Sequence, residues 1–237
     1  MKFLTIDASN MLIAGVCESD FGAVKQLSIQ QSADARHHVE ALAPMVRDVL
    51  HAAGIERPDA IIAGTGPAAF TGLRAGLVTA RTLARAWNVP IYGISSLEAL
   101  ALAGAEQGAN IVEALIDARR REVYALRGRL MGADDIEVLE DARVIRPVDL
   151  AAELENNPAI VVCANPLLYA DEFPERITAQ CTPEILTRLY LSRQSRKDAG
   201  AEIDFRTDPQ YLRRPDVQSG IHAQTSAQGN PYELGMK

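Results

Sequence analysis

The glycines of residues 64–74 come nearest to the spacing of a phosphate-binding loop, in the sequence Gly-Thr-Gly-Pro-Ala-Ala-Phe-Thr-Gly-Leu-Arg. Such loops bind phosphate where a strand leads into a helix, because backbone N–H groups at the helix start face the anion. Gly64, Gly66 and Ala69 nearly satisfy the dinucleotide pattern, but no acid follows at the distance that a ribose requires. No Lys-Ser or Lys-Thr pair closes the segment as in a P-loop. The segment predicts a tight turn without a known nucleotide fingerprint.

Histidine and cysteine do not form a catalytic or metal-binding pattern in this chain. Neither His37 nor His38 has a second histidine four residues later, which is the spacing that would place two imidazoles on one helix face. The three cysteines are odd in number and far apart, which fits neither a disulfide framework nor paired zinc ligands: Cys17, Cys163 and Cys181. No Ser-His-Asp or Cys-His set can be assembled from the four histidines. We expect no catalytic residue and no metal.

Three successive arginines, Arg119, Arg120 and Arg121, have the chemistry to hold a phosphate. A charged turn that is merely solvated is the alternative. The formal net charge of -7 weighs against a large nucleic-acid surface, because such surfaces are rich in Lys and Arg. A stand-alone RNA-binding module is therefore disfavoured, and an RNA substrate is expected to be held by a partner.

The helix expected after the glycine segment, over residues 70–88, has little polar surface. One apolar stripe recurs at spacings of three and four: Phe70, Leu73, Leu77, Ala80, Ala84 and Trp87. A second stripe of mostly small residues lies beside it: Gly72, Gly76, Thr79, Leu83 and Ala86. Two explanations stay open, because either neighbouring elements of this chain or another protein could cover the second stripe.

Hydrophobic periodicity predicts a first lobe that begins with an antiparallel meander of strands at residues 3–7, 12–18 and 24–30. A helix follows over residues 34–53, with a kink at Pro44 and an end at Gly54. Strands at 60–63 and 90–94, on either side of the helix 70–88, complete this lobe.

A smaller second lobe is predicted after it, with strands at 111–117, 122–129, 137–145 and 159–163 and helices at 147–155 and 183–195. Dense charge predicts loops over residues 192–208. The expected division is an N-terminal lobe (1–109), a C-terminal lobe (110–217) and a mobile tail (218–237) rich in Gly, Gln, Ser and Asn.

Composition is that of a soluble globular protein, since 48% of the 237 residues are hydrophobic and 23% are charged. No apolar run is long enough to span a membrane. The N-terminal segment reaches an acid, Asp7, too early for a signal peptide. We expect a cytoplasmic protein without a membrane partner.

Residues 66–74 resemble the G-P-G-S-F-T-G-L-R signature of the bacterial TsaB family, also called YeaZ. Four further segments agree with the family in order and place: Ile6-Asp7-Ala8-Ser9, Arg36-His37-His38-Val39-Glu40, Asp117-Ala118-Arg119 with Glu122-Val123-Tyr124, and Pro209-Gln210-Tyr211-Leu212-Arg213. Ala68 and Ala69 depart from the usual Gly and Ser, which removes a flexible turn position and a helix-capping hydroxyl.

This resemblance implies an α/β fold with two ribonuclease-H-like lobes, the second reduced, as in actin-like ATPases and sugar kinases. It also implies a non-catalytic scaffold in the synthesis of threonylcarbamoyladenosine (t6A) in tRNA. The implied partners are the transferase TsaD and the ATPase TsaE, with tRNA reached through them and a homodimer in isolation. The alternative is a small kinase or hydrolase of the same superfamily that uses Asp7, with Ser9 beside it, and the glycine turn. No cofactor of its own is expected, and ATP or ADP would bind weakly or at the interface with a partner.

The resemblance and the second stripe together place the docking surface on the helices 34–53 and 70–88. The docking residues expected there are His38, Leu42, Met45, Phe70, Gly72, Leu73, Gly76, Leu77, Thr79, Ala80 and Leu83. For His38 a partly buried helix histidine is the alternative. A bulky charge at Gly76 is expected to abolish the complex and to leave the fold mostly intact.

Overall fold

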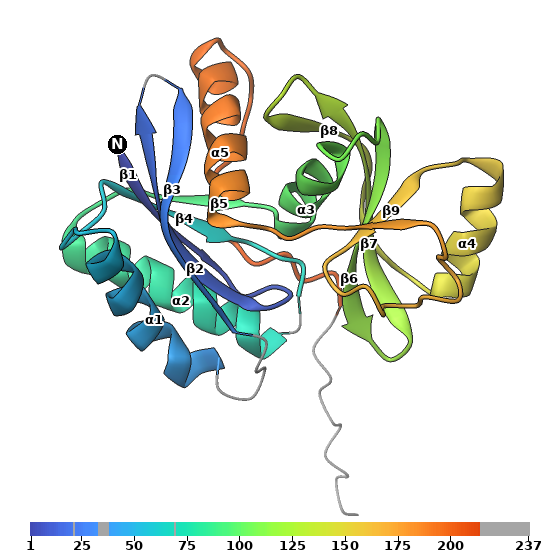
Figure 1. The fold of residues 1–237 in the computed structure, drawn as a ribbon, viewed down its shortest axis with the longest axis horizontal. Helices are drawn as coiled ribbons and strands as arrows, with labels where there is room; N and C mark the ends of the chain where they lie inside the picture. The colour runs from blue at the N-terminus through green and yellow to red at the C-terminus, as the bar shows by residue number, and fades with distance from the viewer. Residues whose placement is uncertain (21, 33–37, 69, 214–237) are drawn as a thin grey trace, which may run out of the picture.

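The computed structural model describes residues 1–20, 22–32, 38–68 and 70–213, without the side chains of residues 38–40 and 70 (Figure 1). The first sheet has the strand order β3-β2-β1-β4-β5. Its strands are β1 (Lys2–Asp7), β2 (Leu12–Asp20), β3 (Ala23–Ser32), β4 (Ala60–Gly64) and β5 (Ile91–Ile94). The first three are antiparallel neighbours, while β4 runs parallel to β1 and β5 parallel to β4. The predicted meander is therefore confirmed.

Two helices, α1 (His38–Ala52) and α2 (Phe70–Trp87), cover one face of this sheet (Figure 1). Their buried side chains form a core with the sheet that includes Leu42 and Val46 of α1 and Leu73 and Leu77 of α2. Gly54 has a φ of 65°, so glycine ends the first helix as predicted. The predicted start of that helix at residues 34–37 lies outside the described residues.

The second sheet repeats the first, with the strand order β10-β9-β6-β7-β8. Its strands are β6 (Ile111–Arg119), β7 (Glu122–Met131), β8 (Asp135–Ile145), β9 (Ile160–Cys163) and β10 (Arg176–Thr178). Here too the first three strands are antiparallel and the last two are parallel to the central one. The helix α4 (Pro147–Asn156) precedes β9 as α1 precedes β4. Residues 164–175, all described, connect β9 to β10 without a counterpart of α2.

Two further helices hold the sheets together by crossing between them (Figure 1). α3 (Ser96–Ala105) follows β5 but packs against β6 and β7 of the second sheet. α5 (Pro183–Asp198) follows β10 but packs against the first three strands of the first sheet. One apolar core therefore contains Phe3 and Ile62 of the first sheet, Leu97 of α3, Val112 of the second sheet and Tyr190 of α5.

Three elements differ from the predictions. The sequence analysis assigned no helix to Ser96–Ala105, because this segment is buried nearly all round and shows no polar face. The short strand Arg176–Thr178 was also missed. Loops were expected from Ser192 onward, whereas α5 continues to Asp198. Part of the charge in α5 faces the protein, since Arg193 Nε donates to the buried Asp135 Oδ1 at 3.1 Å and also pairs with Glu98.

Beyond α5, residues 201–213 form an extended segment that we call the C-terminal strap. The Gly93 N–H at the edge of β5 donates to Phe205 O at 2.8 Å. A side chain at Gly93 would collide with this backbone, since a Cβ there would lie 2.2 Å from Arg206 O. Arg213 at the end of the strap forms an ion pair with Glu122, the first residue of β7.

Candidate functional site

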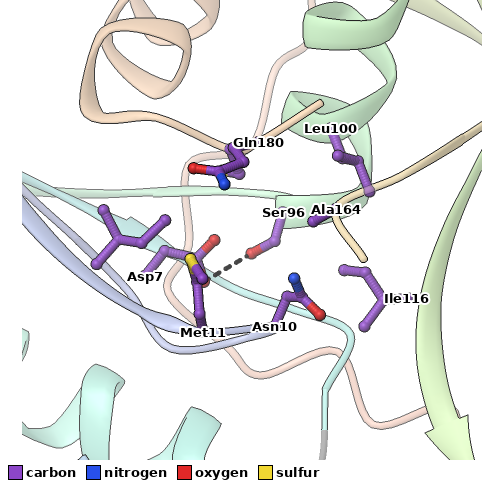
Figure 2. Close-up of a pocket in the computed structure, with 10 residues that line it drawn as sticks. Asp7, Asn10, Met11, Ser96, Leu100, Ile116, Ala164 and Gln180 are labelled. Carbon is purple, nitrogen blue, oxygen red and sulfur yellow. Dashed lines mark hydrogen bonds between the residues drawn. The ribbon is translucent and has the colours of Figure 1, made fainter. Parts of the chain in front are cut away.

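Asp7, the predicted nucleotide-site acid, lies buried at the end of β1 and between the two sheets (Figure 2). Its Oδ1 accepts hydrogen bonds from the Ser9 N–H at 2.8 Å and from Ser96 Oγ at 3.1 Å. The hydroxyls of Ser9 and Ser96 lie 2.7 Å apart and share a further hydrogen bond. The structure thus brings Asp7 and Ser9 together as expected, and adds Ser96, which sequence reasoning did not select.

This carboxylate is held tightly by the surrounding backbone. A Cβ at Gly64 would lie 2.5 Å from Asp7 Oδ1 and 2.8 Å from Ser96 Oγ, so only glycine fits on β4 beside them. Ser96 is the first residue of α3, and the N-terminus of a helix favours a nearby negative charge. The pKa of the Cys181 thiol is raised well above its ordinary value. The largest cause is burial, and the negative charge of Asp7 and a hydrogen bond with Asp7 raise it further. Asp7 therefore joins β1, β4 and α3.

The cavity beside Asp7 is small. It has a volume of about 20 Å³ and is lined by side chains from both halves of the chain, including Asn10, Ile116 and Gln180 (Figure 2). A cavity of this size holds about one water molecule. A nucleotide at Asp7 would need the two sheets to move apart. Among the described residues no group of three His, Cys, Asp or Glu side chains is placed to hold a metal ion.

Asp117 occupies the corresponding place in the second sheet, near the end of β6. Its Oδ1 accepts a hydrogen bond from the Arg119 N–H at 2.7 Å, as Asp7 accepts one from the residue two positions later. The two sheets therefore share a local turn as well as a strand order. Asp117 is half-exposed, whereas Asp7 is buried.

The residues predicted to dock a partner divide by burial. Five of them are buried in the core of this chain and hold its own fold together: Leu42, Met45, Leu73, Leu77 and Ala80. Gly72, Thr79 and Leu83 are half-buried, and the side chains of His38 and Phe70 lie outside the described residues. The structure brings α1 and α2 into contact with each other, as the prediction requires.

Gly76 corrects one expectation. It is buried, and a Cβ there would lie 3.0 Å from the Cβ of Ala8. The small residue serves the close approach of α2 to the chain segment after β1, so a bulky charge at this position would disturb the fold. The second stripe is therefore covered in part by this chain's own residues.

Two of the three arginines of α2, Arg74 and Arg81, have partners in this chain. Arg74 Nε donates to the Tyr211 hydroxyl at 3.0 Å, and Arg81 Nε donates to Thr207 Oγ1 at 2.8 Å. Both partners belong to the C-terminal strap, which therefore binds the side of α2 that carries these arginines. Sequence reasoning had no signal for this contact, because the paired residues are more than a hundred positions apart.

An uncharged strip of α2 remains accessible. We call it the outer face of α2, and it consists of Ala75, Val78, Thr79, Thr82, Leu83 and Ala86. Val78 is 60% exposed, which makes it the most exposed large apolar side chain among the described residues of α2. Val78 lies outside both predicted stripes, so helical periodicity does not select it.

The repeated strand order and the crossed helices define a class: the two-lobed α/β fold of actin-like ATPases and sugar kinases, as predicted. The structure of YeaZ from Pseudomonas aeruginosa matches with a TM-score of 0.70 and 27% identity, covering 89% of this chain and 99% of that one. The sequence model of the family described as TsaD, tRNA N6-adenosine threonylcarbamoyltransferase, matches residues 29–179.

Among curated relatives, an uncharacterized protein of Mycobacterium tuberculosis is 32% identical over 195 residues, which cover 78% of this chain and 79% of the relative. The tRNA threonylcarbamoyladenosine biosynthesis protein TsaB of Escherichia coli is 41% identical over 92 residues, which cover 38% of this chain and 40% of the relative. The chain therefore belongs to the TsaD family and, within it, to the TsaB (YeaZ) branch. No helix in the described part of the chain has the length and apolar character needed to cross a membrane.

Proposed function

We propose that this protein is a non-catalytic scaffold of t6A synthesis, which binds and activates the transferase TsaD and supports the ATPase TsaE. The relatives named TsaB supply the pathway. The observation that carries the scaffold role is the outer face of α2, an uncharged strip around the exposed Val78. Apolar surface of this kind is typical of protein–protein contacts. A role on tRNA also favours the cytoplasm.

The docking surface that we propose is centred on Val78, which the set of residues predicted from the sequence did not contain. Half-buried Thr79 and Leu83 stay in it, Val78 is added, and half-buried Gly72 lies about one turn before the outer face begins. The buried residues of α1 and α2 lie beneath this surface. Small side chains at these positions allow a partner helix to approach closely. Without the transferase, two copies of this chain are expected to pair through the same surface, and tRNA is reached through the partners.

A matched pair of substitutions tests this proposal. Val78 on α2 and Val148 on α4 are both 60% exposed, so Val78→Lys and Val148→Lys add the same charge at sites of equal exposure. We expect Val78→Lys to weaken TsaD binding at least tenfold in calorimetry and Val148→Lys to leave it unchanged, with both melting temperatures close to wild type. Equal affinity for the two variants would contradict the placement of the surface.

A second candidate is a small nucleotide-binding kinase or hydrolase. The observation in its favour is Asp7, which lines a cavity between the sheets and has a counterpart, Asp117, near the corresponding strand end of the second sheet. The size of that cavity favours the scaffold instead. Magnesium-dependent ATP turnover by the purified protein, lost in Asp7→Ala, would establish the second candidate. ATP or ADP bound weakly, or only at the interface with TsaD, would be consistent with the scaffold.

A further inference from the structure

The turn between β6 and β7 consists of arginine. In the strand ladder Arg119 pairs with Glu122, so Arg120 and Arg121 alone form a two-residue hairpin turn. All three arginines are exposed. Their φ angles are 62°, 55° and 60°, so three successive side chains project from left-handed backbone. We call residues 119–121 the basic turn.

The backbone of this turn does not favour arginine. Two-residue hairpin turns with positive φ at both positions prefer Asn-Gly or Gly-Gly, because a longer side chain crowds the neighbouring carbonyl. Because these arginines are exposed, they bury no apolar surface that would offset the cost of the left-handed backbone. A residue choice that opposes the local backbone preference at an exposed position is typical of functional sites.

The charge around the basic turn also differs from that of the whole chain. The chain carries a formal net charge of -7, yet residues 119–121 form its longest run of basic residues. Arg213 of the C-terminal strap adds a fourth guanidinium beside the turn through its ion pair with Glu122. Asp117 binds Arg119 at 3.2 Å. Glu172 also lies close to this corner, because its charge acts on Tyr169 together with those of Asp117 and Arg121. Four arginines against three carboxylates leave a small excess of positive charge here on an acidic protein.

We infer that the basic turn contacts the phosphate backbone of tRNA. The planar guanidinium fork matches pairs of phosphate oxygens, and a narrow hairpin tip can approach a nucleic-acid backbone without reading bases. This inference rests on the proposed function, which supplies tRNA as the RNA. The proposed function leaves most of the tRNA to TsaD, because the rest of this chain is acidic. The basic turn adds one direct contact between this chain and the tRNA.

The test removes the two turn arginines and improves the turn at the same time. Arg120→Asn combined with Arg121→Gly installs the preferred Asn-Gly pair, so the melting temperature should stay the same or rise. The control, Arg129→Gln combined with Arg146→Gln, removes the same charge from two other exposed sites. Binding of labelled unfractionated tRNA to the full chain is measured by fluorescence anisotropy between about 50 and 200 mM salt.

We expect the turn variant to bind tRNA about tenfold more weakly at the lowest salt, with a salt slope smaller by about 1.5 than that of wild type. The control should bind like wild type. Equal losses in the two variants, no loss in the turn variant, or no binding by wild type would overturn the inference. Competition by ATP at constant ionic strength as strong as competition by tRNA would assign the turn to free phosphates instead.

The result is separable from the proposed function. The turn variant should bind TsaD with wild-type affinity, because the basic turn lies on the second sheet and the outer face of α2 on the first lobe. If TsaD binding fails for wild type but tRNA binding still depends on the turn, the inference stands and the scaffold proposal fails. If the turn variant loses binding to TsaE and keeps tRNA binding, the turn binds an acidic protein surface and the inference fails.

Discussion

At the scale of single residues, Asp7 shows how the same side chain can suggest chemistry in a sequence and serve structure in a fold. Its position after the first strand was predictable from the apolar run before it. Its partners were not, because Ser96 is 89 residues away and reaches Asp7 only through a helix that the sequence did not reveal. Gly64, selected as part of a phosphate-like loop, makes room for this carboxylate.

Replacing Asp7 tests the structural role directly. Asp7→Ala leaves the Ser9 N–H and the Ser96 hydroxyl with one buried acceptor fewer, so we expect the free energy of unfolding to fall by about 1–3 kcal/mol. Asp117→Ala is the matched control, since it removes the same charge from the half-exposed counterpart turn and should lose less. Urea unfolding of both variants measures the two losses of free energy. Equal losses would contradict the stabilising role of the buried Asp7 carboxylate.

A buried thiol gives a prediction about pH. The pKa of Cys17 on β2 is raised from 9.0 to about 12, mainly because the thiol is buried. A hydrogen bond with Thr187 lowers this pKa, and the charge of Glu184 raises it. The unfolded chain therefore ionises this thiol first, and stability falls as pH rises from about 9 towards 12, by up to about 1.4 kcal/mol per pH unit.

The control for this effect is Cys17→Ala, which should make the dependence less steep over the same range. Part of the dependence stays, because burial also raises the pKa values of Cys163 and Cys181. Guanidinium unfolding at several pH values above 8 measures both proteins. Parallel curves for wild type and Cys17→Ala would show that the thiol ionises equally in the folded and unfolded states.

At the scale of elements, amphipathic helices and strands with an apolar run were predictable, whereas a helix buried nearly all round and a strand of three residues were not. α1, α2, α4 and the long strands have the expected periodicities. α3 has none, because eight of its ten residues are buried, although the sequence Ser95-Ser96-Leu97-Glu98 carries a capping signal. The end of α5 was misread since its arginines pair with buried acids rather than with water.

The ion pairs of α5 give a prediction at this scale. Asp135 on β8 is 1% exposed and pairs with Arg193 and Arg196. Asp135→Asn leaves Arg193 with Glu98 as its acidic partner, so we expect the free energy of unfolding to fall by about 2–4 kcal/mol. Glu137→Gln is the control, because the pair with Arg129 is about half-exposed and should contribute less than about 1 kcal/mol. Equal losses of unfolding free energy for Asp135→Asn and Glu137→Gln, measured in urea, would contradict a stabilising role of the buried ion pairs between Asp135 and α5.

At the scale of the whole molecule, two sheets of one topology are joined by exchanged helices and by the C-terminal strap. The family signature implied the two-lobed fold before any geometry was known, and the repeated strand order confirms it. The docking surface was only partly predictable, because helical periodicity cannot distinguish cover by another protein from cover by distant parts of the same chain. Ala8 and the strap provide such cover for α2. The predicted lobe boundary at residues 109 and 110 stays a prediction.

We propose that this protein acts by binding TsaD. Light scattering after size exclusion, with the protein alone and mixed with TsaD from the same source, tests it most directly. We predict a homodimer that converts on mixing to a complex of one chain with one TsaD, because we propose the outer face of α2 as the contact surface of both assemblies. Two proteins that elute separately, with and without ATP and magnesium, would contradict the scaffold function.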